Sequence, residues 1–476
     1  MSTIKHASKN ALWLTIAEIV AKVVAFISVI LITRYLTKDS FGQYTFVMSM
    51  GIIFGVLANF GFGVYVTREI ARSKEKAGKI VGNLLSLKLI LSGVVLVLLF
   101  LTAQFLDKPS YVVIAIYVVS FLTVFDALRS FLGGVFQAYE KMGYLAVVKV
   151  GERLLYLVLV LVAIYLDKGI VFIVGSAAAA SFIFALVSFA LVHYKFTPIR
   201  LRWDKVFILQ ILLGTVFFLI NDIFIVVFFR IDTVMLSLMT SDALTATYSA
   251  AYNLIYAVTF IPGVLSAVLF PVLTRFYKTN KDVFKSNLTL IFKYFMLVSL
   301  PVMAFFIIFS EKLIVIIYKE KYIDSVPIFQ LLTFGLGFVF LNFIFSTILN
   351  TVNKQKLVAA SSFIAMILNI VLNFILIPQF TMYGAAVATI ITEFTFCLAL
   401  ALFVHKQFKI VNTVILKKLL FVCISLVVAI VCAYIARFNP YVSFTVFLLV
   451  FAVLLFFFRI FAKKDKDYIL EALHLK

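Results

Sequence analysis

The chain has 476 residues, of which 64% are hydrophobic and only 13% are charged. Soluble globular domains are about 45–50% apolar and about 25% charged, so this composition excludes a soluble protein and indicates an integral membrane protein. The formal net charge of +21 would suggest nucleic-acid binding in a soluble protein, but the distribution of the charges along this chain argues otherwise.

Fourteen apolar segments are long enough to cross a bilayer, because about 20 residues at 1.5 Å each cover the roughly 30 Å hydrocarbon core. No small-residue cleavage site follows the first, which is therefore predicted to be an uncleaved span. Polar residues from Asn221 to Asp232 predict a bent or tilted seventh span, and Pro262 and Pro271 predict a kink in the eighth. The predicted spans are residues 11–33, 41–66, 81–106, 111–137, 144–166, 169–194, 206–239, 243–274, 287–310, 325–349, 357–378, 384–404, 419–436 and 441–461.

A short motif repeats after the sixth span. Thr37-Lys38-Asp39, followed by Tyr44, recurs as Thr240-Ser241-Asp242, followed by Tyr248. Six spans per copy is an even number, so both halves would have the same orientation in the membrane. We therefore predict a six-helix lobe over 1–205, a second six-helix lobe over 206–405, and two further helices with a tail over 406–476.

The basic residues predict the orientation of the chain. Of the 42 lysine and arginine residues, 27 fall in the two termini and the loops on their side, 8 fall in the opposite loops, and 7 lie inside spans. By the positive-inside rule both termini are cytoplasmic, which predicts a multi-pass protein of the cytoplasmic membrane. The same asymmetry accounts for most of the net charge, so the expected partners of these residues are membrane lipids and not nucleic acid.

Several cations lie far from the predicted membrane surfaces. Counted from the cytoplasmic ends of their spans, Lys22, Lys88, Arg129 and Arg153 are roughly 12–17 Å deep. A charge at that depth costs about 2.5–3.5 kcal/mol on insertion scales unless protein or water surrounds it. Together with Arg230 in the seventh span, they predict a cavity site for an anion such as phosphate. Lys88 is the strongest single candidate, because its own helix carries no acid.

Acidic residues leave two interpretations open. Glu18 and Lys22 are spaced i,i+4, and Asp126 and Arg129 are spaced i,i+3, so these charges can also form local ion pairs that only hold the bundle together. Alternatively, Glu18, Asp126, Asp222 and Glu393 take part in coupling to H+ or Na+. The asparagines within the predicted spans, Asn221, Asn342, Asn369 and Asn373, are expected mainly to form hydrogen bonds between helices.

The chain shows no set of catalytic residues. Its four histidines lie in the tails or at span ends, and no glycine-rich phosphate loop with a lysine is present. Cys397, Cys423 and Cys432 lie in apolar runs without metal-binding spacing. We therefore predict that the protein is not an enzyme and binds no metal ion or organic cofactor.

A set of short motifs is spread over the whole chain. They are Asn10-Ala-Leu-Trp13, Arg34-Tyr-Leu-Thr37, Phe41-Gly-Gln-Tyr44, Thr67-Arg-Glu-Ile-Ala71, Phe136-Gln-Ala-Tyr-Glu-Lys-Met142, Tyr248-Ser-Ala-Ala-Tyr252, Asn369-Ile-Val-Leu-Asn373 before Pro378, and Tyr383-Gly-Ala-Ala386 through Thr392-Glu393. Together these motifs resemble the Wzx-like polysaccharide flippases of the multidrug/oligosaccharidyl-lipid/polysaccharide (MOP) exporter superfamily. The resemblance implies two six-helix lobes around a central cavity and alternating access that moves a lipid-pyrophosphate-linked oligosaccharide to the outer leaflet, driven by an ion gradient or the membrane potential. It also implies polysaccharide-assembly proteins as partners.

Three other functions are alternatives to a flippase. A drug or organic-cation exporter of the same fold should present unpaired acids in its cavity, and the excess of cations in the first half argues against it. A membrane-embedded glycan polymerase or glycosyltransferase needs a large catalytic loop, whereas every predicted loop is short. The sequence does not separate a transporter from a transport-inactive membrane scaffold.

Overall fold

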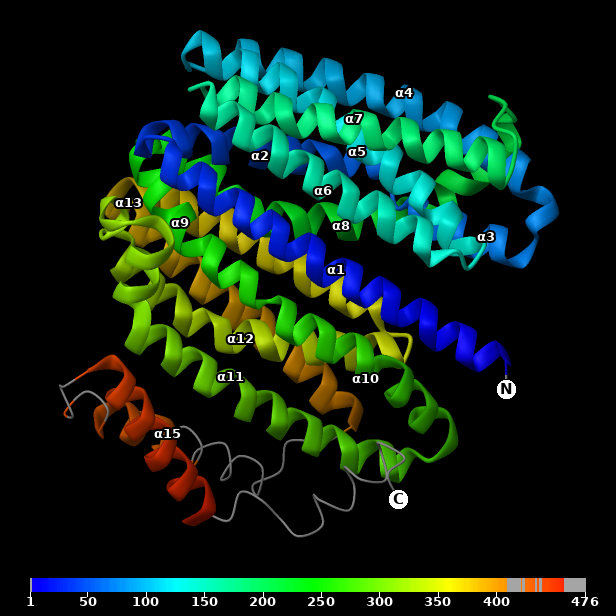
Figure 1. Cartoon of the computed structure of the whole chain (residues 1–476). Helices are drawn as coiled ribbons and strands as arrows, with labels where there is room; N and C mark the ends of the chain where they lie inside the picture. Colours follow the sequence, from blue (N-terminus) through cyan, green and yellow to red (C-terminus); the bar gives the residue numbers. More distant parts are fainter. Residues whose placement is uncertain (1, 409–420, 422–423, 433–434, 436–438, 458–476) are drawn as a thin grey trace. The chain divides into compact units, whose positions relative to one another are not determined.

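The computed structural model describes residues 2–408, 421, 424–432, 435 and 439–457, and within them it contains helices and no strand (Figure 1). The chain divides into two compact units, one that ends at Ala246 and one that begins at Thr247. The predicted lobe boundary after residue 205 stays a prediction, but α8 packs against α2 and so belongs to the first unit. The helices of the first unit are α1 (Ser2–Tyr35), α2 (Lys38–Asn59), α3 (Phe62–Arg72), α4 (Ala77–Gln104), α5 (Ser110–Ala138), α6 (Met142–Tyr165), α7 (Ile170–Lys195) and α8 (Lys205–Met239).

The second unit contains most of α9 and the helices after it. Its bundle is built around α12, which packs against α13, α11 and α10, while α15 packs against α11. The bounds are α9 (Asp242–Val258), α10 (Phe260–Thr279), α11 (Lys281–Tyr318), α12 (Ser325–Thr351), α13 (Gln355–Phe408) and α15 (Pro440–Phe457); two 3-10 turns, η1 (Lys74–Lys76) and η2 (Glu320–Tyr322), lie between helices.

The helices confirm an all-α protein with many membrane spans. Ten helical segments of the described residues are long and apolar enough to cross a membrane. One of them, α13, is two helices joined at Thr381, whose φ of 51° and ψ of −128° are not helical. With the 24-residue α6 and the shorter α15, these segments account for every predicted span except 419–436, which lies partly outside the described residues.

The second predicted span is broken, which the sequence analysis did not predict. Phe60 and Gly61 both have left-handed backbone conformations, with φ of 48° and 67°, and they separate α2 from α3. Such a conformation is easy for glycine and costs energy for phenylalanine. A Cβ on Gly61 would also lie 2.9 Å from Cβ of Phe218 on α8, so the break is packed tightly against that helix.

The predicted kink in the eighth span is confirmed. α9 ends at Val258 and α10 begins at Phe260, shortly before Pro262. A proline ring collides with the carbonyl four residues earlier, which here belongs to Val258, the last residue of α9. α8, by contrast, runs through its polar residues as one helix of 35 residues, and a bend in it stays a prediction.

Small residues let the helices of the first unit approach closely. The run from Ser176 to Ser181 on α7 is largely buried, and α7 packs along α5. Where α3 crosses α5, a Cβ on Gly134 would lie 2.8 Å from the carbonyl oxygen of Gly63. The Thr67 hydroxyl lies 2.9 Å from that oxygen and 3.1 Å from the carbonyl oxygen of Gly134. This packing of small and hydroxyl side chains replaces the hydrophobic effect, which contributes little between helices in lipid.

The linker from α7 to α8 is attached to the start of α4. The Asp204 N–H donates to Asn83 Oδ1 at 2.7 Å, and the Asp204 carboxylate accepts from Lys79 Nζ at 2.8 Å and from the Phe207 N–H at 3.1 Å. The hydrogen bond from Lys79, followed by the bond from the Phe207 amide, holds the pKa of Asp204 below its usual value. Asp204 is thus the N-cap of α8 as well as the partner of Lys79.

We expect Asp204→Ala to lower the melting temperature at neutral pH by more than Asp204→Asn, because asparagine keeps the cap and loses only the ion pair. A lowered folded-state pKa stabilises the fold above the ordinary pKa of an aspartate, and this contribution is lost as pH falls through the lowered value. The difference in melting temperature between the wild-type protein and Asp204→Asn should therefore become smaller in strong acid. Thermal melts of the detergent-solubilised variants over a pH series would measure it, and a gap that stays constant would contradict the assignment.

Candidate functional site

The candidate site is a cluster of charged side chains in the first unit, and its centre is on α5. Arg129 Nη2 donates to Asp126 Oδ1, one helical turn away, which confirms that this pair can form. The Arg129 side chain is only 9% exposed, whereas 41% of the Asp126 side chain is exposed. Arg129 Nε has no hydrogen-bond partner among the described residues. A buried guanidinium therefore retains an unused donor next to an accessible carboxylate.

A second acid–base pair on α6 faces the first. Arg153 Nε lies 3.3 Å from Glu152 Oε2, and the two side chains differ in exposure, at 39% for Arg153 and 4% for Glu152. Glu152 also interacts electrostatically with Arg129, and Asp126 with Arg153. The two pairs consequently form one alternating array of two arginines and two carboxylates across α5 and α6.

Two tyrosines extend the cluster toward α2 and α8. The hydroxyl oxygens of Tyr44 on α2 and Tyr156 on α6 are 3.1 Å apart and buried. Tyr44 interacts electrostatically with Arg153 and with Arg230 of α8, and Tyr156 with Arg153 and Glu152. The sequence analysis did not propose either tyrosine as a site residue. Tyr156 follows Glu152 and Arg153 by one helical turn, so helical spacing could have pointed to it.

Lys88 interacts electrostatically with Asp126 of the cluster but is otherwise enclosed. Its side chain is 1% exposed, and Nζ donates to the carbonyl oxygen of Ala58 at 3.0 Å. The ammonium lies 5.9 Å from the ring centre of Phe62 and 5.7 Å from that of Phe131, at distances where cation–π attraction operates. The sequence predicted a cation open to an anionic ligand, whereas the hydrogen bond observed is to the end of α2.

The remaining predicted residues are less closely associated. Lys149 Nζ of α6 donates to Glu18 Oε1 of α1, so Glu18 has a partner on another helix. The side chain of Lys22, its neighbour one helical turn away, is exposed. Asp222 is exposed on α8. In the second unit, the buried Glu393 Oε2 accepts from Asn342 Nδ2 at 2.7 Å, between α13 and α12.

The structure thus brings Arg129, Arg153, Arg230 and Asp126 into one cluster, with Lys88 at its edge. Asn342 forms the predicted bond between helices, while Asn373 donates to Asn369 within α13 at 3.0 Å. In the part of the chain that the structure describes, no group of three His, Cys, Asp or Glu side chains is placed to hold a metal ion. Whether the cluster binds phosphate stays a prediction.

A family comparison covers most of the first unit. The family described as polysaccharide biosynthesis protein matches residues 7–277, more than half of the chain. The chain belongs to this family. A second model, MatE, matches residues 218–375. An uncharacterized membrane protein of Methanocaldococcus jannaschii is 26% identical over 166 residues, which is 34% of this chain, and the match spans only a third of that relative.

Three solved structures with a similar fold are a flippase and two transporters. A lipid II flippase, MurJ, in an inward closed conformation superposes with a TM-score of 0.73 at 15% identity, covering 94% of this chain and 99% of that one. An inward-facing multidrug resistance MATE transporter of the MOP superfamily gives 0.66 at 16% identity, covering 82% and 94%. A MOP transporter of Pyrococcus furiosus, whose binding pocket is described as having reverse polarity, gives 0.59 at 14% identity, covering 84% and 96%. This member of the polysaccharide biosynthesis family therefore shares the fold of these proteins, and ten of its described helical segments are long and apolar enough to cross a membrane.

Proposed function

We propose that the protein translocates a lipid-(pyro)phosphate-linked oligosaccharide across the cytoplasmic membrane for the synthesis of a cell-surface polysaccharide, with both termini in the cytoplasm. The observation that carries the proposal is the cluster in which Arg129 and Arg153 pair with Asp126 and Glu152, with Arg230 linked to it through Tyr44. The family match supports a role in polysaccharide synthesis, and polysaccharide-assembly proteins are the expected partners.

The geometry suits reversible binding of a phosphate group. Arginine presents planar paired donors that match phosphate oxygens. Arg153 is accessible, and Arg129 holds an unused Nε donor. Without a ligand, Asp126 and Glu152 keep the guanidinium groups paired, which avoids the cost of a buried unpaired charge. A phosphate therefore replaces the carboxylates as the partner of the arginines, and the guanidinium groups are paired both with and without substrate. Lys22 and Lys88 stay predictions as phosphate ligands, and Lys88 acts on the cluster through Asp126.

Ion coupling forms part of the same proposal, with H+ or Na+ as the coupling ion and no organic cofactor. The carboxylates assigned to it are Glu18, Asp126, Asp222 and Glu393. Asp126 has the clearest link to the substrate site, because loss of its negative charge frees Arg129 for phosphate. Glu393 is buried in the second unit and accepts a hydrogen bond from Asn342. Its role would therefore be in ion coupling and not in contact with the substrate.

Arg153→Gln is expected to slow translocation about 10- to 150-fold, since one charge-assisted contact to phosphate contributes about 1.5–3 kcal/mol. The assay is leaflet-resolved translocation of a lipid-diphosphate oligosaccharide in proteoliposomes, with and without a pH or sodium gradient. Lys195→Gln is the control, because Lys195 is an exposed cation in the last turn of α7, lies against the Tyr144 ring and is assigned neither to the phosphate site nor to ion coupling. A folded Arg153→Gln protein that translocates at the wild-type rate would remove the anion site from the proposal.

A drug or organic-cation exporter is the second candidate, and the MatE match over residues 218–375 favours it. The same proteoliposomes can be tested with a fluorescent organic cation. Movement of the dye without any translocation of the lipid-linked oligosaccharide would favour the exporter. Translocation of the lipid-linked substrate alone would exclude it.

A further inference from the structure

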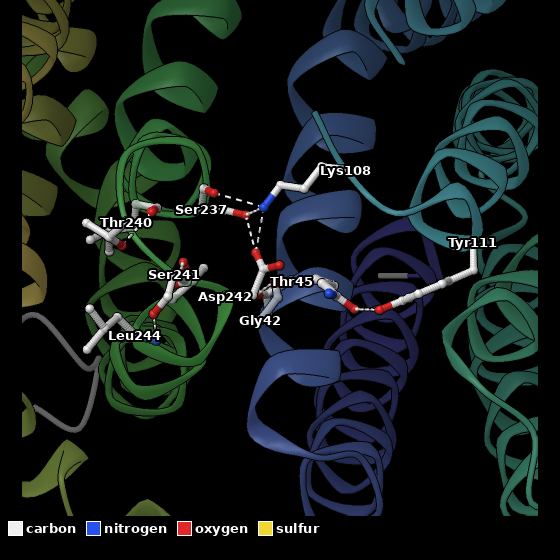
Figure 2. Close-up of polar contacts among 12 residues, drawn as sticks. Gly42, Thr45, Lys108, Tyr111, Ser237, Thr240, Ser241, Asp242 and Leu244 are labelled. Atoms are coloured by element: carbon white, nitrogen blue, oxygen red, sulfur yellow. Dashed lines mark hydrogen bonds and ion pairs between the residues drawn. The ribbon is translucent and has the colours of Figure 1, made fainter. Parts of the chain in front are cut away.

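Lys108 joins two turns of the first unit. It lies between α4 and α5, and its ammonium donates to the carbonyl oxygen of Ser237 at 2.9 Å, to Ser237 Oγ at 2.9 Å and to Asp242 Oδ1 at 2.8 Å (Figure 2). An ammonium has three N–H donors, so this lysine is fully used. The Ser237 hydroxyl also lies 2.6 Å from Asp242 Oδ1, which closes a compact three-residue network.

Each partner of Lys108 lies at a helix end where its charge is favourable. The Ser237 carbonyl is among the last four of α8, which lack partners within the helix, and a cation stabilises that negative end. Asp242 is the first residue of α9, where an acid stabilises the positive end. The Lys108 and Asp242 side chains are 10% and 13% exposed, so water screens the pair much less than a surface ion pair.

α2 also packs against the turn between α8 and α9. A Cβ on Gly42 would overlap the backbone carbonyl oxygen of Asp242, so α2 and the start of α9 touch backbone to backbone. The next residue of α2, Gln43, accepts a hydrogen bond through Oε1 from the Tyr111 hydroxyl of α5 at 3.0 Å. The first turn of α9 is consequently fixed to α2, to α8 and to the α4–α5 turn.

This attachment lies next to the boundary between the two units. The first unit ends at Ala246, four residues after Asp242, and α9 continues as a helix to Val258 in the second unit. We propose that Lys108, Asp242 and Gly42 form a permanent anchor that holds the start of α9 to the first unit throughout the transport cycle. Lys108 is then a positioning residue, since it holds the first turn of the helix that continues from the first unit into the second. The part of this inference that concerns the cycle depends on the proposed transport function.

The wild-type protein tests whether the anchor ever opens. Proteoliposomes are treated with a membrane-permeant amine-reactive ester, with and without an imposed pH or sodium gradient, and labelling of each lysine is followed by mass spectrometry. Lys319, which is exposed, is the reactivity reference. A permanent anchor keeps Lys108 at least about tenfold slower than Lys319 in both conditions. Labelling of Lys108 that becomes as fast as that of Lys319 under a gradient would show a gate that opens and would overturn the proposal.

Variants test whether Lys108 holds the turn. Lys108→Met should speed amide hydrogen exchange at residues 242–246 about tenfold, while exchange along residues 176–181 of α7 stays the same. Lys108→Arg should restore slow exchange, because it keeps charge and donors. Lys168→Met is the matched control, a lysine in another interhelical turn whose ammonium lies against the Phe172 ring. Unchanged exchange in Lys108→Met would refute the anchor. Neither experiment uses the oligosaccharide, so a failure of the proposed substrate would leave both results valid.

Discussion

Gly42→Ala is expected to destabilise the protein by more than about 3 kcal/mol, at the upper end of overpacking effects. The new Cβ would overlap the carbonyl oxygen of Asp242 and lie 2.6 Å from its carbonyl carbon and 3.1 Å from its Cα. These are backbone atoms, which cannot rotate away as the end of a side chain can. Lys108 also holds the α8–α9 turn in place, so the whole turn would have to shift.

Thermal and denaturant unfolding of the detergent-solubilised protein would measure this loss. Gly93→Ala is the matched control, because nothing lies within 4 Å of a Cβ added there and alanine favours a helix over glycine by about 0.5–1 kcal/mol. Similar unfolding of the two variants would contradict the backbone contact. Combining Gly42→Ala with Lys108→Met should cost less than the sum of the single changes, because a released turn can move away from the new methyl group.

The membrane spans could be predicted from the sequence because lipid imposes a simple rule on each segment separately. Every apolar segment within the described residues contains a helix, and Pro262 predicted the break after Val258 from steric reasons alone. The pair of Asp126 and Arg129 was also predictable, since both residues lie on one helix at a fixed spacing. Local geometry carries all of these predictions.

Contacts between distant helices could not be predicted by the same reasoning. Glu18 receives a hydrogen bond from Lys149, which is 131 residues away, and Tyr44 meets Tyr156 across 112 residues. Helical spacing does not say which faces of two distant helices meet. The break at Phe60 was missed for a different reason, because phenylalanine is unfavourable in a left-handed conformation and only the packing around it maintains that geometry.

The motifs that resemble the family mostly explain the fold. Thr67, at the start of one motif, contacts Gly134, and its hydroxyl lies 3.3 Å from Gln137 Oε1 in another. Gly384 follows the kink at Thr381, and a Cβ there would overlap the carbonyl oxygen of Leu376. These residues allow close contacts that larger side chains would prevent. They indicate how the bundle packs, while the charged cluster, which carries the proposed chemistry, is outside them except for Tyr44.

Lys88→Met is expected to destabilise the first unit by about 2–3 kcal/mol. Methionine fills a similar volume but cannot donate to the Ala58 carbonyl, one of the last four of α2, and leaves it buried without a partner. It also removes a cation from the negative end of that helix and from the surroundings of Asp126. α2 ends here, and the chain turns at Phe60 and Gly61. We therefore expect the substitution to loosen the junction between α2 and α3 most.

Unfolding of Lys88→Met should be compared with that of Leu87→Met, a neighbouring buried position where a volume-conserving change costs less than about 1.5 kcal/mol. Translocation by the folded fraction of each variant is measured in parallel. If Lys88 has a structural role, Lys88→Met should be less stable than Leu87→Met. Its translocation rate per folded molecule should then be reduced less than that of Arg153→Gln. The opposite pattern, wild-type stability with translocation lost, would instead assign Lys88 to the substrate phosphate. The two outcomes separate because the bond to Ala58 contributes whether or not substrate is present, whereas a bond to phosphate contributes only during transport.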